Sequence, residues 1–126
     1  MASISRVSMG LLLSLVCAGG AVAQGLRPVR PIEGYSCKKL NVTEREVMSP
    51  NGGGVNLRGA PNASAPAVAI APSVLFVKNA APVNGFVEVM RLNGQPGWIE
   101  QARVKPFDPN ARCVPSIMSD GRPGMG

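Results

Sequence analysis

The sequence contains no histidine, and only five of its 126 residues are aromatic. Histidine is the commonest acid, base and metal ligand of enzymes, so the usual basis for acid–base catalysis and zinc binding is missing. No G-x-S-x-G motif and no glycine-rich run leading into a helix is present, which excludes two common signatures of serine hydrolases and phosphate-binding sites. These absences predict a protein that is not an enzyme and binds no cofactor.

Acidic residues are also few, seven in all, and only Glu88 and Glu100 suggest a carboxylate pair of the catalytic kind, because they can approach each other across a hairpin. Both occupy positions expected to be exposed, where pKa values shift little. We therefore interpret them as part of a solvated face beside Arg91 or Arg103.

Long apolar runs are confined to the N-terminus, where residues 1–23 have the layout of a secretory signal peptide. Arg6 precedes an apolar run at residues 9–16, and an A-x-A site at residues 21–23 precedes Gln24. The run is shorter than the 18 or more apolar residues that a membrane span needs. A lipoprotein signal ending at Cys17 is the lesser alternative, because Val16 stands where such signals carry a small residue. We expect a periplasmic or secreted protein that begins at Gln24.

Cleavage at that site leaves 103 residues with a net charge of +5, because Arg6 is the charged residue that is removed. A single domain of this size has a small core and gains from a covalent cross-link. Two cysteines remain, Cys37 and Cys113, and an even pair in an exported chain predicts a disulfide. The alternatives are half of a metal site, for which histidine is missing, and a reactive thiol, which needs an activating partner.

Short apolar runs separated by Gly, Pro, Asn and Ser characterise the middle of the chain. They lie at residues 67–70, 74–77, 86–90 and 98–99. Runs of this length, rich in β-branched and aromatic residues and bounded by turn formers, predict short β-strands. The pattern indicates an all-β fold, while residues 45–49 remain open between strand and helix.

Two motifs in this region resemble the signatures of the bacterial Src-homology-3 (SH3) domain. Residues 56–61, N-L-R-G-A-P, are similar to its opening N-[VL]-R-x-x-P, and residues 93–99, N-G-Q-P-G-W-I, to its closing N-G-x-x-G-W-[VI]. The resemblance covers roughly half of the chain. It implies a small SH3-like β-barrel of about five to six short strands. It also implies a binding module for cell-wall (peptidoglycan) peptides or an envelope protein partner; the alternative is a structural or accessory subunit of a larger envelope assembly.

The resemblance also divides the mature chain into three parts. An extended leader is expected at residues 24–41, the barrel at residues 42–113, and a disordered tail at residues 114–126, which is rich in Pro, Ser, Gly and Met. Because the first and last strands of an SH3-type barrel lie together, the resemblance brings Cys37 and Cys113 within bonding reach.

The face on which Trp98 lies depends on the register of the hairpin that turns at residues 93–94. A two-residue turn places Val89 opposite Trp98, whereas a slip with a bulge places Val89 opposite Ile99. In the family the residue after this tryptophan belongs to the core, so the resemblance favours Ile99 inward and Trp98 outward.

An outward Trp98 can form an aromatic patch with Phe86 on the neighbouring strand, with Tyr35 at its edge. Aromatic rings bury much area at low entropic cost, so these three residues are the candidate ligand-binding site. The alternative is that Trp98 covers one end of a barrel that is too small to enclose it.

The excess of basic residues favours anionic partners. Nucleic acid is not expected, because the exported chain lacks clustered Lys and Arg and stacking aromatic residues. The loop at residues 59–66 is uncharged, which with so few aromatics argues against recognition of proline-rich peptides. Anionic polymers of the cell envelope are the remaining candidate partners. The alternative is that the positive charge serves only solubility.

Overall fold

The computed structural model describes residues 25–47 and 54–126. The expected signal peptide, its cleavage site and Cys17 lie outside the described residues. Within the described part, no helix is long and apolar enough to cross a membrane.

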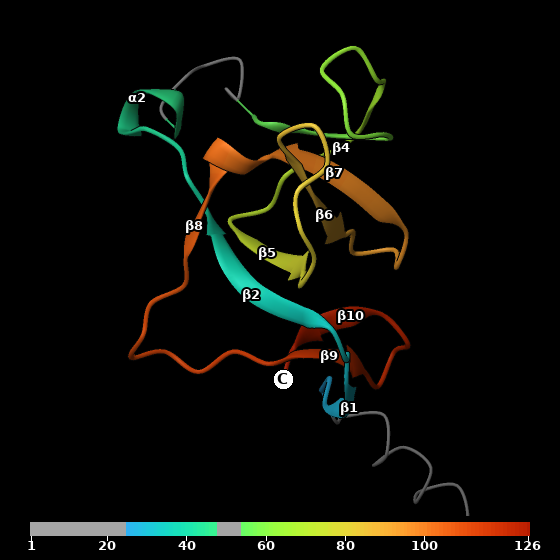
Figure 1. Ribbon diagram of the computed structural model, residues 1–126. Coiled ribbons are helices and arrows are strands. Elements are labelled where there is room, and N and C mark those ends of the chain that lie inside the picture. The colour runs from blue at the N-terminus through green and yellow to red at the C-terminus, as the bar shows by residue number, and fades with distance from the viewer. Residues whose placement is uncertain (1–24, 48–53) are drawn as a thin grey trace, which may run out of the picture.

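The described residues form ten strands in two antiparallel sheets (Figure 1). The larger sheet has the order β4-β3-β7-β6-β5-β2-β8, and the smaller sheet has the order β1-β9-β10. Helical structure in the described part is limited to two short turns, α2 (Glu44–Val47) and the 3₁₀ helix η1 (Gln101–Arg103). The strands are β1 (Pro28–Pro31), β2 (Tyr35–Leu40), β3 (Asn56–Arg58), β4 (Ala67–Ile70), β5 (Val74–Lys78), β6 (Phe86–Met90), β7 (Pro96–Glu100), β8 (Val104–Pro106), β9 (Pro115–Met118) and β10 (Pro123–Met125).

The all-β prediction is confirmed, but the larger sheet is not closed into a barrel. Its end strands β4 and β8 each pair on one side only within the described residues. Both are short, and prolines lie next to their ends: Pro66 and Pro72 flank β4, and Pro106 ends β8. Proline has no N–H to donate, so a ladder cannot be extended through these positions.

The core lies on one face of the larger sheet. Apart from Ala71, which follows β4, its buried members come from alternate positions of β3, β5, β6 and β7, as the two-residue period of a strand requires. Complete burial of one such aliphatic side chain contributes about 1.5 to 3 kcal/mol. The buried cluster consists of Leu57, Ala71, Leu75, Val77, Val89 and Ile99.

The hairpin between β6 and β7 has a register that neither sequence alternative predicted. Val89 lies opposite Gly97, and Val87 lies opposite Ile99. The Arg91 N–H donates to Gln95 O, and Gly94 adopts a φ of 84°, so the loop has three residues with a left-handed glycine at its end. The inward position of Ile99 is confirmed, since a shift of two residues preserves the face.

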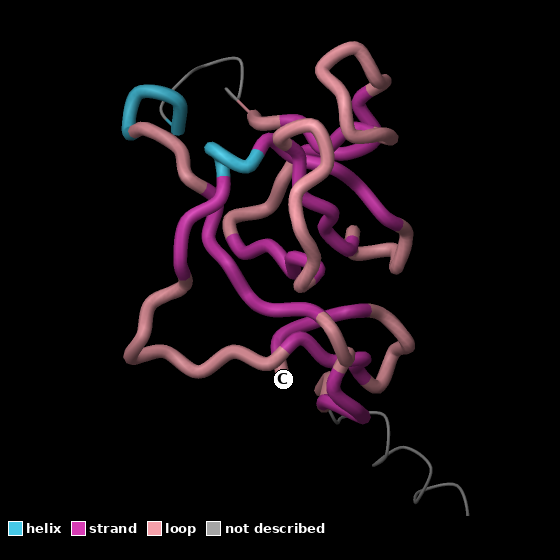
Figure 2. Tube along the Cα trace, viewed as in Figure 1, coloured by secondary structure: helices cyan, strands magenta, loops and turns pink. Residues whose placement is uncertain are grey.

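The chain on either side of the predicted barrel contributes strands. Tyr35–Leu40, expected to be part of an extended leader, is β2 and lies between β5 and β8. Two segments of the expected disordered tail, Pro115–Met118 and Pro123–Met125, are β9 and β10, and β9 pairs with β1 as well (Figure 2). The expectation of disorder rested on the Pro, Ser, Gly and Met composition of this segment. Composition does not report the backbone pairing that forms the small sheet.

The predicted disulfide is present. Cys37 in β2 is bonded to Cys113, two residues before β9. The bond therefore connects the larger sheet to the start of the smaller one.

Candidate functional site

A row of polar and aromatic side chains crosses the face of the larger sheet opposite the core. Residues directly opposite each other on neighbouring strands project to the same face. Arg58 lies opposite Trp98, and Trp98 lies opposite Glu88. Glu88 pairs with Lys78 at 3.8 Å, and Lys78 lies opposite Tyr35. The row thus runs across β3, β7, β6, β5 and β2.

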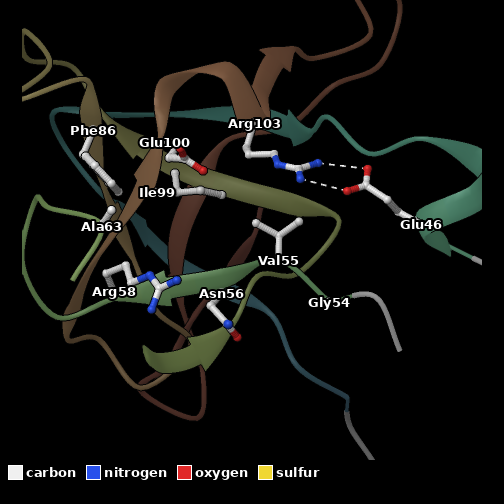
Figure 3. A pocket seen from close by; sticks show the side chains of 10 residues that line it. All are labelled: Glu46, Gly54, Val55, Asn56, Arg58, Ala63, Phe86, Ile99, Glu100 and Arg103. Carbon is white, nitrogen blue, oxygen red and sulfur yellow. Dashed lines mark hydrogen bonds and ion pairs between the residues drawn. The ribbon is translucent and has the colours of Figure 1, made fainter. Parts of the chain in front are cut away.

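A groove of about 250 Å³ lies beside the Arg58 end of this row (Figure 3). Phe86 and Ala63 lie toward one end, and the joined side chains of Arg103 and Glu46 form the other. Phe86 lies opposite Glu100, so both project to the face that carries Arg58. Ten residues from β3, β6, β7 and the flanking turns line the groove: Glu46, Gly54, Val55, Asn56, Arg58, Ala63, Phe86, Ile99, Glu100 and Arg103.

Arg58 is the cationic group that the groove leaves available. Its Nη1 donates to Ala65 O at 3.2 Å, which holds the guanidinium beside the loop at residues 59–66. Among the described residues, no carboxylate lies within ion-pair distance of it. A planar guanidinium with N–H groups to spare is suited to a carboxylate or phosphate.

Arg103 is already paired. Its Nη1 and Nη2 donate to the two carboxylate oxygens of Glu46 at 2.9 and 2.8 Å. The hydrogen bond from Arg103, followed by the one from the Thr43 amide, lowers the pKa of Glu46 from 4.5 to about 2. Both groups are therefore charged at neutral pH, and the pair forms one end of the groove.

A capping box holds Glu46 in place for this contact. The Thr43 N–H donates to Glu46 Oε1 at 2.8 Å, and the Glu46 N–H donates to Thr43 Oγ1 at 3.1 Å. This reciprocal arrangement is typical of a helix N-terminus with the pattern T-x-x-E. The pattern was present at residues 43–46. Of residues 45–49, which the sequence left open between strand and helix, the described ones are helical, in α2; residues 48 and 49 lie outside the described residues.

The three aromatic residues predicted as a binding patch occupy different positions. Trp98 is half-buried on the face of Arg58, and Phe86, diagonal to it on β6, is 7% exposed and lines the groove. Tyr35 is in the same row as Trp98 but three strands away, about 14 Å along a flat sheet. The structure thus brings Trp98 and Phe86 to one face beside the groove, and it places Tyr35 at the far end of the row.

The sequence did not predict that the charged residues Arg58, Glu100 and Arg103 belong to the site. Arg58 belongs to the N-L-R motif, but nothing in one strand indicates that its partner strand carries Trp98 and Glu100. Glu88 and Glu100 do lie on one face, two positions apart in register. Arg103 lies near Glu100, as expected, and both line the groove. The ion-pair partner of Glu88 is Lys78, which was not expected. Only the register of β7 between β3 and β6 reveals this grouping.

The described residues contain no group of three or more His, Cys, Asp or Glu side chains placed to hold a metal ion. Comparisons of the chain with protein-family models, curated proteins and solved structures find no match.

Proposed function

We propose that the protein is an exported, non-catalytic binding module of SH3-like type that holds cell-wall peptides in the groove beside Arg58. Its place of action would be the periplasm or the exterior of the cell. The signal-peptide pattern, the Cys37–Cys113 disulfide and the basic charge support that location and an anionic envelope partner.

The observation that carries this proposal is the arrangement of charges in the groove. Arg58 offers a cation without a carboxylate partner among the described residues, and exposed Glu100 offers an anion on the same face. A ligand that fits such a groove carries both a carboxylate and an ammonium group. Short cell-wall peptides, with free carboxylates and free amines, have this chemistry, and the small exposed part of Phe86 that lines the groove adds an apolar contact.

Binding of the mature chain, residues 24–126, to purified cell-wall sacculi tests the proposal. We expect Arg58→Gln to weaken retention about tenfold to a hundredfold, because a charge-assisted hydrogen bond contributes about 1.5 to 3 kcal/mol. Arg112→Gln is the matched control: it removes the same charge from the exposed connection before β9, outside the groove.

The melting temperatures of both variants show whether a loss of retention comes from unfolding. Equal retention of the two variants would contradict the proposal. Stoichiometric co-purification of one envelope protein, with no retention on sacculi, would instead favour an accessory subunit of a larger assembly.

A further inference from the structure

A second, apolar groove of about 280 Å³ lies at the β4 end of the larger sheet and shares no lining residue with the groove of Arg58. It is bounded by β4 on one side and by the β6–β7 turn on the other, and the core residue Leu57 contributes to its lining. Its exposed apolar side chains are Ile70 at 70%, Leu92 at 60% and Val68 at 37%. These are large exposures for aliphatic residues gathered at one place.

The backbone beside this groove has hydrogen-bonding groups to offer, because β4 is an end strand (Figure 1). The Ala71 N–H donates to Val55 O at 2.8 Å, and Ile70 lies opposite Asn56 as the next pair. Paired residues in an antiparallel ladder alternate between bonded and non-bonded, so the Ile70 N–H and C=O point away from β3.

One cation lies across the groove from this edge. Arg91 donates its Nε–H to Pro96 O at 3.0 Å, and no described carboxylate lies within ion-pair distance of it. An acidic side chain on a ligand would therefore meet a positive charge here without displacing an existing ion pair.

We propose that β4 and this groove bind an extended segment of a partner protein that has apolar side chains at alternate positions and an acidic residue near Arg91. The segment adds a strand to β4, so that its backbone supplies the hydrogen bonds and one apolar side chain enters the groove beside Leu92. Pro66 and Pro72 limit the added ladder to about the four residues of β4.

The short length of β4 also disfavours a second copy of this chain as the occupant. A stable dimer buries about 1,200 to 2,000 Å², far more than two four-residue strands provide. Two copies also carry the same positive net charge and repel each other.

The test uses the mature chain, residues 24–126, and the peptide acetyl-Thr-Val-Thr-Val-Asp-amide, followed by NMR. We expect the largest amide shift changes at Val68, Ile70 and Leu92, and at least about tenfold weaker binding when Lys replaces the Asp of the peptide. Ile70→Asp should weaken binding of the Asp peptide to a similar degree. Val29→Asp is the control, since Val29 is 63% exposed on the smaller sheet.

Shift changes confined to residues outside this groove would overturn the proposal, as would equal binding of the Lys and Asp peptides. It would also be overturned if sedimentation showed a dimer that Ile70→Asp dissociates, because the occupant would then be a second copy. This result is independent of cell-wall binding, which depends on Arg58 in the other groove.

Discussion

Glu46 connects two parts of the chain through one carboxylate. It caps α2 through Thr43 and forms two hydrogen bonds with Arg103, which belongs to η1 more than fifty residues away. The contact fixes one end of the groove, so the ionisation of a single side chain is coupled to the shape of the site.

The ionisation of Glu46 predicts how stability depends on pH. Its pKa in the folded protein is about 2, below the ordinary 4.5, because of the hydrogen bond from Arg103 and then that from Thr43. Because the pKa of Glu46 is lower in the folded protein than in the unfolded chain, its ionised form stabilises the fold above pH 4.5. This contribution is lost as the pH falls from about 4.5 toward 2. Glu46→Gln should therefore lower the melting temperature at pH 7, with a difference from the parent protein that shrinks toward pH 2.

Thermal unfolding of the two proteins between pH 2 and pH 7 measures this difference. Glu44→Gln is the control, because Glu44 is exposed on the same helical turn and has no ion pair among the described residues. A difference that stays constant over the whole pH range would contradict the assigned role of Glu46.

For Trp98 and Ile99, the sequence was enough to predict which side chain faces the core. Alternation requires neighbours in a strand to face opposite sides, and the SH3-like motif indicated which of the two is inward; Ile99 is 1% exposed in the core. The role of Trp98 stays a prediction: it lies half-buried beside Arg58 and outside the core cluster. The sequence could not show that Phe86, two positions from Glu88, is itself buried.

At the scale of elements, strands with a strong apolar run were predictable from sequence. β4 and β6 have the bounds that their runs of β-favouring residues indicated, and β5 extends its run by one residue. Such runs report local preference and burial on one face. Strands β1, β9 and β10 each begin with proline and carry no such signal. β1 is defined by pairing with β9 at the other end of the described chain, and β9 and β10 form a short hairpin.

Register was the least predictable property of the elements. The Asn93-Gly94 pair does mark the turn between β6 and β7, but the loop uses three residues with Gly94 last, so the pairing moves by two from the favoured alternative. This shift places Glu88, in place of Met90, beside Trp98. The arrangement of charges in the site therefore depends on the length of this turn. The sequence indicated where the turn lies but not its length.

At the scale of the whole molecule, the disulfide connects the two sheets. Cys37 and Cys113 are 76 residues apart, and the chain-entropy model gives about 4 kcal/mol for closing such a loop. That is a large share of the 5 to 15 kcal/mol typical of a domain. Cys37→Ser with Cys113→Ser should lower the melting temperature substantially and expose the amides of β9 and β10 to hydrogen exchange before those of the larger sheet.

Calorimetry and hydrogen exchange on the oxidised protein and the double variant measure both effects. Free thiols at both positions in exported material, found by non-reducing peptide mapping, would show that the bond does not form in the cell.

The described residues form an open all-β fold with a polar groove beside Arg58 and a separate apolar groove beside β4, which the core residue Leu57 also lines. We propose that the polar groove holds cell-wall peptides. The most direct measurement is an NMR titration of residues 24–126 with soluble peptides released from sacculi. We expect saturable amide shift changes centred on Asn56, Arg58 and Glu100, which are lost in Arg58→Gln. Shift changes that centre elsewhere, or that persist in Arg58→Gln, would contradict it.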